Sequence, residues 1–196
     1  PSQLTTVIVT LDPETMGGRK VAERVALLSK IGYEDPYRAV TNNKGIMNGV
    51  DAVLIATGND YRAIESATAV LANQDGHYRS LSKWTMQDGK LVGELTLPMA
   101  IGVVGGSIKA RKDVQQSFAI LGKKITSAKL AEIIVSVGLA NNLAALLAIS
   151  TVGIQAGHMK LQARNIVAEL DASDDEKKQV LTQIIEQKDY SESYAQ

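Results

Sequence analysis

The sequence contains no cysteine and only two histidines, His77 and His158, among its 196 residues. The absence of cysteine excludes disulfide-stapled folds, thiolate zinc sites and cysteine nucleophiles, and it fits a reducing cytoplasm. Two histidines also leave little material for a histidine-rich metal centre. We therefore expect a cytoplasmic protein with no resident metal.

Neither charge sign is in excess, because 21 basic and 21 acidic side chains cancel. A protein that binds nucleic acid or an anionic membrane surface usually carries a basic excess, so we expect neither partner. Aromatic residues make up only 4% of the chain, whereas 45% of it is hydrophobic. The core must therefore be aliphatic and rich in alanine. The length suits one domain, or one large domain with a small appendage.

One uncharged run, residues 133–157, is long enough to cross a bilayer. Asn141 and Asn142 lie near its middle, and two adjacent amides at bilayer depth are costly without partners. We therefore expect a buried helix of a globular protein. The two amides then need hydrogen-bond partners inside the protein, or a ligand.

The hydrophobic periodicity predicts an α+β fold that is mainly helical, with a few β-strands and a central buried helix. An Asp-Gly turn at residues 88–89 indicates a hairpin. The expected strands are residues 5–11, 78–86 and 91–99, and a loop is expected at residues 102–107. The expected helices are residues 21–31, 37–56, 60–73, 113–121, 127–150, 158–170 and 173–188. The tail from Tyr190 to Gln196 is polar and is expected to fray.

The expected helix at residues 37–56 has an unusual second face. At 100° per residue that face collects polar or small residues, namely Arg38, Thr41, Asn42, Lys44, Gly45, Asn48, Gly49 and Ala52. Two glycines in a helix cost about 1 kcal/mol each relative to alanine, so bare backbone here suggests the close approach of a ligand or of another backbone. Arg38 can clamp a carboxylate, Lys44 offers a compact cation, and Asn48 can donate or accept. The alternative interpretation is an ordinary solvated face.

Two further candidates have equally simple structural explanations. Asp60 either caps the helix that follows it or faces Lys44 across the helix junction, where it would hold the ammonium charged and oriented. His158 follows a glycine break and is either a general acid or base at the edge of a mobile element or a surface histidine. His77 and the Gly105-Gly106 turn suggest no function, and no phosphate-binding loop, dinucleotide fingerprint or nucleophile elbow is present.

Three blocks of sequence carry a family resemblance. They are DPYRAVTNNKGIMNG at residues 35–49, ATGNDYRA at residues 56–63 and GIQAGHMKLQARN at residues 153–165. In this order they resemble class II (bacterial-type) 3-hydroxy-3-methylglutaryl-coenzyme A reductase, and the similarity runs through nearly the whole chain.

The resemblance implies a four-electron reduction of 3-hydroxy-3-methylglutaryl-coenzyme A to mevalonate and coenzyme A, or the reverse oxidation, with two NADH or NADPH. Lys44 matches the lysine that polarises the thioester carbonyl, and Asp60 matches the aspartate beside it. His158 matches the histidine that protonates the departing thiolate. Arg38 and Asn48 match residues that hold the carboxylate and oxygens of the hydroxymethylglutaryl group.

The departures from the family pattern define which portion of the enzyme is expected. The family's catalytic glutamate and its nicotinamide-binding domain, with a DAMGAN-type motif, precede the matched region and are not in this chain. We therefore interpret residues 1–152 as part of the large substrate-binding domain and residues 153–196 as the start of the C-terminal flap. The family builds its active site at a dimer interface, which implies a homodimer or a higher multiple of dimers.

Two other classes of function stay open at this point. The chain is alternatively a non-catalytic module that binds an acyl-coenzyme A or a dicarboxylate, or an oligomerisation core whose polar helix face is a subunit contact. A pure binding module has no need of Lys44, Asp60 and His158 together, which favours the reductase.

Overall fold

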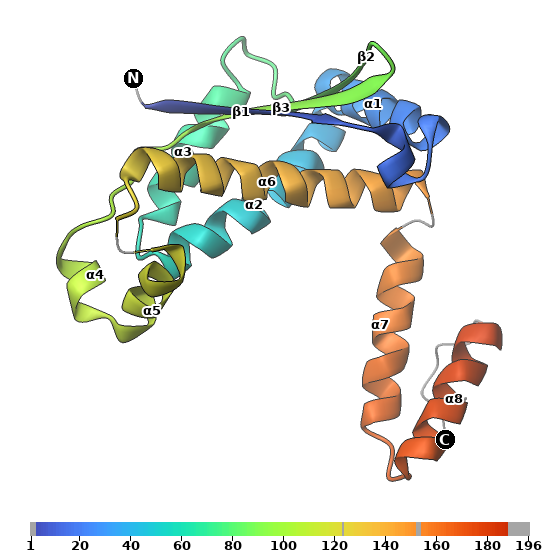
Figure 1. The fold of residues 1–196 in the computed structure, drawn as a ribbon. Helices are drawn as coiled ribbons and strands as arrows, with labels where there is room; N and C mark the ends of the chain where they lie inside the picture. Colours follow the sequence, from blue (N-terminus) through green and yellow to red (C-terminus); the bar gives the residue numbers. More distant parts are fainter. Residues whose placement is uncertain (1–2, 123, 152–153, 188–196) are drawn as a thin grey trace. The chain divides into compact units, whose positions relative to one another are not determined.

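The computed structural model describes residues 3–122, 124–151 and 154–187 (Figure 1). The chain divides into two compact units, Pro1–Leu147 and Ala148–Gln196, which are described separately. The elements, in chain order, are β1 (Leu4–Leu11), a short 3₁₀ helix (Pro13–Met16), α1 (Arg19–Glu34), α2 (Pro36–Ala56), α3 (Tyr61–Ala72), β2 (Ser82–Gln87), β3 (Lys90–Pro98), α4 (Gly106–Ala110), α5 (Lys112–Leu121), α6 (Ser127–Ser150), α7 (Ile154–Ala168) and α8 (Asp174–Gln187). This α+β arrangement confirms the predicted fold class.

The strands form an antiparallel sheet in the order β1-β3-β2. The hairpin between β2 and β3 turns at Asp88 and Gly89, whose φ angles of 49° and 75° suit the predicted Asp-Gly turn. Burial alternates along β1 with a period of two residues. One face of the sheet therefore packs on the core and the other meets solvent.

Three predicted boundaries were wrong. The strand expected from residue 78 begins at Ser82, because the backbone before it bonds to helix residues. Ser80 N–H donates to the Gly32 carbonyl, and the Asn43 side chain bonds the backbone of Arg79 and Leu81. The expected loop at 102–107 contains the start of α4, and α7 begins four residues before His158 instead of at it.

Helix α6 is the central buried helix that the sequence predicts. Of the described helices, it alone has the length and apolar composition to cross a membrane, a test that core helices of globular proteins also pass. Its residues Leu130, Ile134 and Leu146 are fully buried in the core. At Gly138 the helix has no side chain, and a β-carbon there would lie 2.8 Å from Val50 Cγ2 of α2. The helices α2 and α6 therefore pack closely at a glycine.

Buried amides connect α6 to α2 and to the sheet. Asn142 is 1% exposed and Asn42 is 4% exposed. The Asn142 amide donates to Asn42 Oδ1 at 2.8 Å, and Asn142 Oδ1 accepts from Trp84 Nε1 at 2.8 Å. Asn42 in turn donates to the hydroxyls of Ser80 and Ser82. The predicted need of the Asn141–Asn142 pair for internal partners is confirmed, because Asn141 donates to the Gly45 carbonyl.

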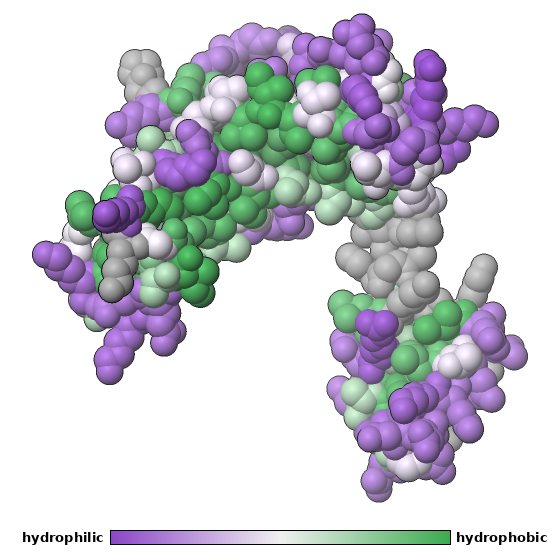
Figure 2. All heavy atoms as spheres, viewed as in Figure 1, coloured by the Kyte–Doolittle hydropathy of each residue, from purple (hydrophilic) through white to green (hydrophobic). Residues whose placement is uncertain are grey.

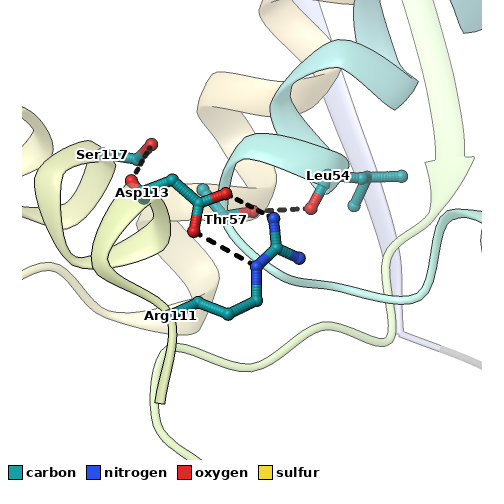
Figure 3. A network of polar contacts seen from close by, with 5 residues as sticks. All are labelled: Leu54, Thr57, Arg111, Asp113 and Ser117. Carbon is teal, nitrogen blue, oxygen red and sulfur yellow. Dashed lines mark hydrogen bonds and ion pairs between the residues drawn. The ribbon is translucent and has the colours of Figure 1, made fainter. Parts of the chain in front are cut away.

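Local hydrogen bonds stabilise the ends of α2 and α5 (Figure 3). The Thr57 hydroxyl donates to the Leu54 carbonyl at 3.2 Å, at the C-terminus of α2. At the start of α5, the guanidinium of Arg111 forms two bonds to the carboxylate of Asp113, which lowers the pKa of that carboxyl. The Arg111–Asp113 pair is exposed, and the first amides of α5 have no side-chain cap, so this pair contributes little to stability.

The second unit contains the helix pair α7 and α8. Among the described residues of α7 and α8, the buried apolar cluster consists of Ala163 and Val167 of α7 and Ile184 of α8. At the start of α8, Ser173 and Glu176 form a reciprocal capping box, with the Ser173 amide donating to Glu176 Oε2 at 2.9 Å. The tail from Tyr190 to Gln196, predicted to fray, lies outside the described residues.

Replacement by alanine is expected to change the free energy of unfolding in opposite directions at Gly138 of α6 and Gly45 of α2. We expect Gly138→Ala to lower the free energy of unfolding by about 1–3 kcal/mol, because its β-carbon overpacks Val50 and Ile46. The matched control is Gly45→Ala, since no atom lies within 4 Å of that β-carbon, and we expect it to raise stability by about 0.5–1 kcal/mol. Urea denaturation measures both, and equal effects would contradict the packing account.

Candidate functional site

Helix α2 carries most of the candidate residues and has a well-defined start. The Asp35 carboxylate accepts from the Tyr37 and Arg38 amides at 2.8 and 3.4 Å, and Pro36 occupies the first turn. These are strong N-terminal signals, because capping satisfies amides that lack a helical partner and proline needs none. One side of the helix is committed to α6 and the sheet. The other side faces α3.

A cavity of about 330 Å³ lies between these two helices. From α2 it is lined by Lys44, Asn48 and Asp51, which lie at i, i+4 and i+7 and therefore share one stripe of the helix. The remaining lining residues are Val40, Asn43 and Met47 of α2, Glu65, Thr68 and Ala69 of α3, and Tyr78. The cavity is thus lined by a cation, two amides and two carboxyl groups together with apolar side chains.

Lys44 and Asn48 are exposed at this cavity, and neither has a hydrogen-bond or ion-pair partner among the described residues. An ammonium that no carboxylate of the described chain neutralises is available to an anionic or carbonyl ligand. The structure therefore brings together two of the predicted site residues in an arrangement suited to binding oxygen atoms.

Asp51 and Glu65 form a carboxyl pair in the same cavity. Burial, together with the neighbouring Glu65, raises the pKa of Asp51 to about 7. Asp51 Oδ1 is buried, and it has no hydrogen-bond partner among the described residues. Burial and the negative charge of Glu65 both favour the protonated form of the Asp51 carboxyl.

Arg38 and Asp60 do not line this cavity. The Arg38 side chain lies toward α1, with Cγ 3.8 Å from the position that a β-carbon would take at Gly32. Asp60 caps α3, accepting from the Arg62 and Ala63 amides at 3.1 and 3.3 Å. The capping role considered for Asp60 is therefore present. A role beside Lys44 stays a prediction.

His158 lies in α7, within the second unit. Its backbone is helical, but its side chain lies outside the described part of the structure. Its predicted role as an acid therefore stays a prediction.

Part of the polar face predicted for α2 is buried. Asn42 is committed to the amide network with Asn142, and Gly49 packs against α6, where its β-carbon would lie 3.2 Å from the Val137 carbonyl oxygen. Two explanations for the glycines of this face follow from the sequence, namely the close approach of a ligand or of another backbone. At Gly49 the structure shows that another backbone approaches.

Asp51, Glu65 and Thr68 are cavity residues that sequence reasoning missed. Thr68 is 3% exposed, and its hydroxyl is a buried polar group without a hydrogen-bond partner in the described structure. The spacing from Lys44 to Asp51 was a usable signal, since i and i+7 share a helix face. No sequence signal marked the two α3 residues, because their role depends on how α3 packs against α2.

A larger cavity of about 540 Å³ lies between α1 and β2. Apolar atoms and the long side chains of Lys30 and Lys83 line it, and none of the predicted site residues does. Volume alone therefore does not locate the site. The smaller cavity contains the convergent polar groups that a binding site requires.

Comparison with known proteins connects this cavity to one family. The family model described as hydroxymethylglutaryl-coenzyme A reductase matches residues 4–163. The 3-hydroxy-3-methylglutaryl-coenzyme A reductase of Archaeoglobus fulgidus is 44% identical over 166 residues, which are 84% of this chain and 38% of that protein. A probable enzyme of the same name from Borreliella burgdorferi is 40% identical over 179 residues, 89% of this chain and 41% of that protein.

Solved structures agree with the sequence comparisons. The 3-hydroxy-3-methylglutaryl-coenzyme A reductase of Streptococcus pneumoniae superposes with a TM-score of 0.76 and 44% identity, covering 98% of this chain and 47% of that one. A class II enzyme structure from the same organism, described as bound to NADPH in open conformations, gives a TM-score of 0.74. The chain therefore spans less than half the length of each of these relatives.

The raised pKa of Asp51 predicts how stability depends on pH. Between the ordinary pKa of 3.8 and about 7, the folded state binds a proton that the unfolded state has lost, so the contribution of Asp51 makes stability fall as pH rises. We expect Asp51→Asn to remove this slope and to be more stable than the natural chain at pH 8. Thermal unfolding between pH 5 and 8 is the measurement, and a slope that Asp51→Asn leaves unchanged would contradict the assignment.

Proposed function

Because this chain belongs to the hydroxymethylglutaryl-coenzyme A reductase family, we propose that it is the substrate-holding portion of such an enzyme. The reaction is the reduction of 3-hydroxy-3-methylglutaryl-coenzyme A to mevalonate and free coenzyme A, or its reverse, with two molecules of NADH or NADPH. The activity belongs to the complete protein, since the chain spans less than half the length of its relatives. The observation that carries this proposal is the placement of Lys44 and Asn48 in one cavity, within the matched region.

Lys44 is the electrophilic group in this proposal. Its ammonium, which has no carboxylate partner in the described structure, donates a hydrogen bond to the thioester carbonyl oxygen. The same bond strengthens as negative charge develops on that oxygen in the tetrahedral hemithioacetal. Asn48, one turn along the same stripe, holds a second oxygen of the acyl group by donating from its amide.

Arg38 holds the free carboxylate of the substrate. It lies six residues before Lys44 in α2, which is about 9 Å along the helix axis. The side chain of Arg38 lies toward α1 and does not line the Lys44 cavity, so this role rests on the match of Arg38 to the family motif. A guanidinium binds a carboxylate with two parallel hydrogen bonds and thereby orients it.

Asp60 and His158 complete the proposed chemistry. Asp60 is placed beside Lys44 in the assembled enzyme, where its carboxylate holds the ammonium charged and oriented. His158 protonates the departing coenzyme A thiolate, since an imidazolium with an ordinary pKa near 6.5 is a suitable donor to a thiolate of higher basicity. Both roles rest on the match of these residues to the family motifs.

The nicotinamide cofactor supplies hydride, and we assign its binding mainly to a part of the enzyme outside this chain. The Lys44 cavity, about 330 Å³ in volume, suits an acyl group and is small for a dinucleotide. The described residues also contain no dinucleotide fingerprint. Accordingly, none of the residue roles proposed for this chain includes cofactor binding.

The complete enzyme is proposed to be a cytoplasmic homodimer or a higher multiple of dimers, independent of membranes and nucleic acid. Apolar residues remain on the surface of the first unit over α5 and α6 (Figure 2). Ile120 of α5 is 87% exposed and Tyr37 of α2 is 86% exposed. Exposed apolar surface of this kind is typical of subunit contacts. We further propose residues 1–152 as substrate-binding domain and 153–196 as flap.

Replacement of Lys44 tests the catalytic proposal. In the complete enzyme we expect Lys44→Ala to lower kcat by at least about 100-fold, because the hydrogen bond to the developing oxyanion is lost. The circular dichroism spectrum is expected to stay unchanged, since Lys44 is exposed. The exposed Lys83→Ala variant is the matched control and keeps its rate. A near-normal rate in Lys44→Ala refutes the oxyanion role.

Replacement of Arg38 tests substrate binding separately from chemistry. We expect Arg38→Ala to weaken the binding of hydroxymethylglutarate about 10- to 100-fold, through loss of a bidentate carboxylate contact. Titration calorimetry measures this, with Arg62→Ala as a control that removes an exposed arginine of α3. Unchanged affinity contradicts the carboxylate role. Binding by a complete protein that shows no turnover identifies the non-catalytic binding module instead.

A further inference from the structure

The cavity of about 540 Å³ between α1 and β2 has no part in the chemistry described so far. From β2 it is lined by five consecutive residues, 82–86. Neighbouring residues of a strand point to opposite faces of a sheet, and β2 is at one end of the strand order. The cavity therefore runs along the outer edge of β2, beside α1.

Contacts within the protein hold the walls of this cavity in place. The Trp84 amide donates to Ser29 Oγ at 2.9 Å, which joins β2 to α1, and the Trp84 indole donates to Asn142 Oδ1 at 2.8 Å. The Tyr33 ring is held by Arg79, whose guanidinium carbon lies 4.5 Å from the centre of the ring. The cavity is thus formed by the packed fold itself, as ligand pockets usually are.

The charged residues that line the cavity are both cations. Lys30 comes from α1 and Lys83 from β2, and no carboxylate lines the cavity. Glu34 follows Lys30 by four residues, and Glu94 lies opposite Lys83 in the strand register. Neither glutamate forms an ion pair with its lysine in the described structure. Two ammonium groups at one cavity favour an anionic ligand.

Much of the remaining lining is carbon. Ala26, Met86 and the Tyr33 ring contribute apolar surface, and the two lysines are exposed. A lysine packs its alkyl stem along apolar surface and keeps its ammonium in water, so we expect the positive charge on the solvent side of the cavity. An occupant that fits both parts has a hydrocarbon body and one anionic head.

We propose that this cavity is a binding site for a medium-chain fatty acid, with the alkyl chain against Ala26 and Met86 and the carboxylate at Lys30 and Lys83. Burial of the chain removes apolar surface from water, and the ammonium groups donate charge-assisted hydrogen bonds to the head. This inference goes beyond the proposed function and does not depend on it, because none of the residues assigned to the reductase reaction lines the cavity.

Titration calorimetry of the intact protein with sodium decanoate, below the concentration at which it forms micelles, is the test. We expect saturable binding, with affinity about fourfold weaker for each methylene removed in nonanoate and octanoate. Decanol has the same chain without the charge, and we expect it to bind at least about threefold more weakly than decanoate.

Two variants test the charge and the volume of the cavity separately. We expect Lys30→Gln to weaken decanoate binding about three- to tenfold, through loss of a charged hydrogen bond. Ala26→Leu places a larger side chain in the cavity, and we expect it to weaken binding at least about tenfold. Lys20→Gln, at an exposed position of α1 outside the cavity, is the matched control and keeps the affinity. Lys30 is exposed, so its variant remains informative if Ala26→Leu fails to fold.

The outcomes separate this inference from the proposed function. Absence of saturable decanoate binding overturns the fatty acid site, and so does an affinity that Lys30→Gln leaves unchanged. Displacement of decanoate by hydroxymethylglutarate also overturns it, because the two ligands then share one site. If decanoate binds as expected and hydroxymethylglutarate does not bind at all, the fatty acid site is supported and the proposed function fails.

Discussion

The hydrogen bond between the Asn42 and Asn142 side chains is the contact on which the rest of the first unit depends. It joins α2 to α6 inside the core, and through Trp84 it also fixes the sheet. Aliphatic side chains pack in many alternative registers, but an amide must meet its partner in one geometry or lose several hydrogen bonds at once. In a core with few aromatic residues, this polar contact supplies specificity that hydrophobic packing alone does not.

The orientation of α2 links this core to the candidate site. Because Asn42 and Gly49 commit one side of the helix to α6, Lys44 and Asn48 are directed to the opposite side, where α3 packs. The same helix thus serves as a core element and as a ligand-binding surface. A rigid helix anchored on its far side holds polar groups in fixed positions more accurately than a loop does.

Much of this architecture follows from local sequence. Periodicity and the Asp88-Gly89 turn predicted the elements, since they depend on short-range geometry. The shared cavity of Lys44 and Asn48 also agrees with the predicted helical face. The burial of Asn42 and the pairing of Asp51 with Glu65 required the tertiary structure, because each depends on which helix packs on which face of α2. Such information is absent from the spacing of residues along one helix.

The sequence separation of the amide contact also sets the order of assembly. Asn42 and Asn142 are 100 residues apart, and a ribosome adds about 5–20 residues per second, so α2 waits about 5–20 s for its partner. Closing so long a loop costs entropy before any contact is gained. The hydroxyls of Ser80 and Ser82, which also accept from Asn42, follow it by only 38 and 40 residues, so they are synthesised well before Asn142. Asn42 can therefore join α2 to the serines at the start of β2 first and to α6 last.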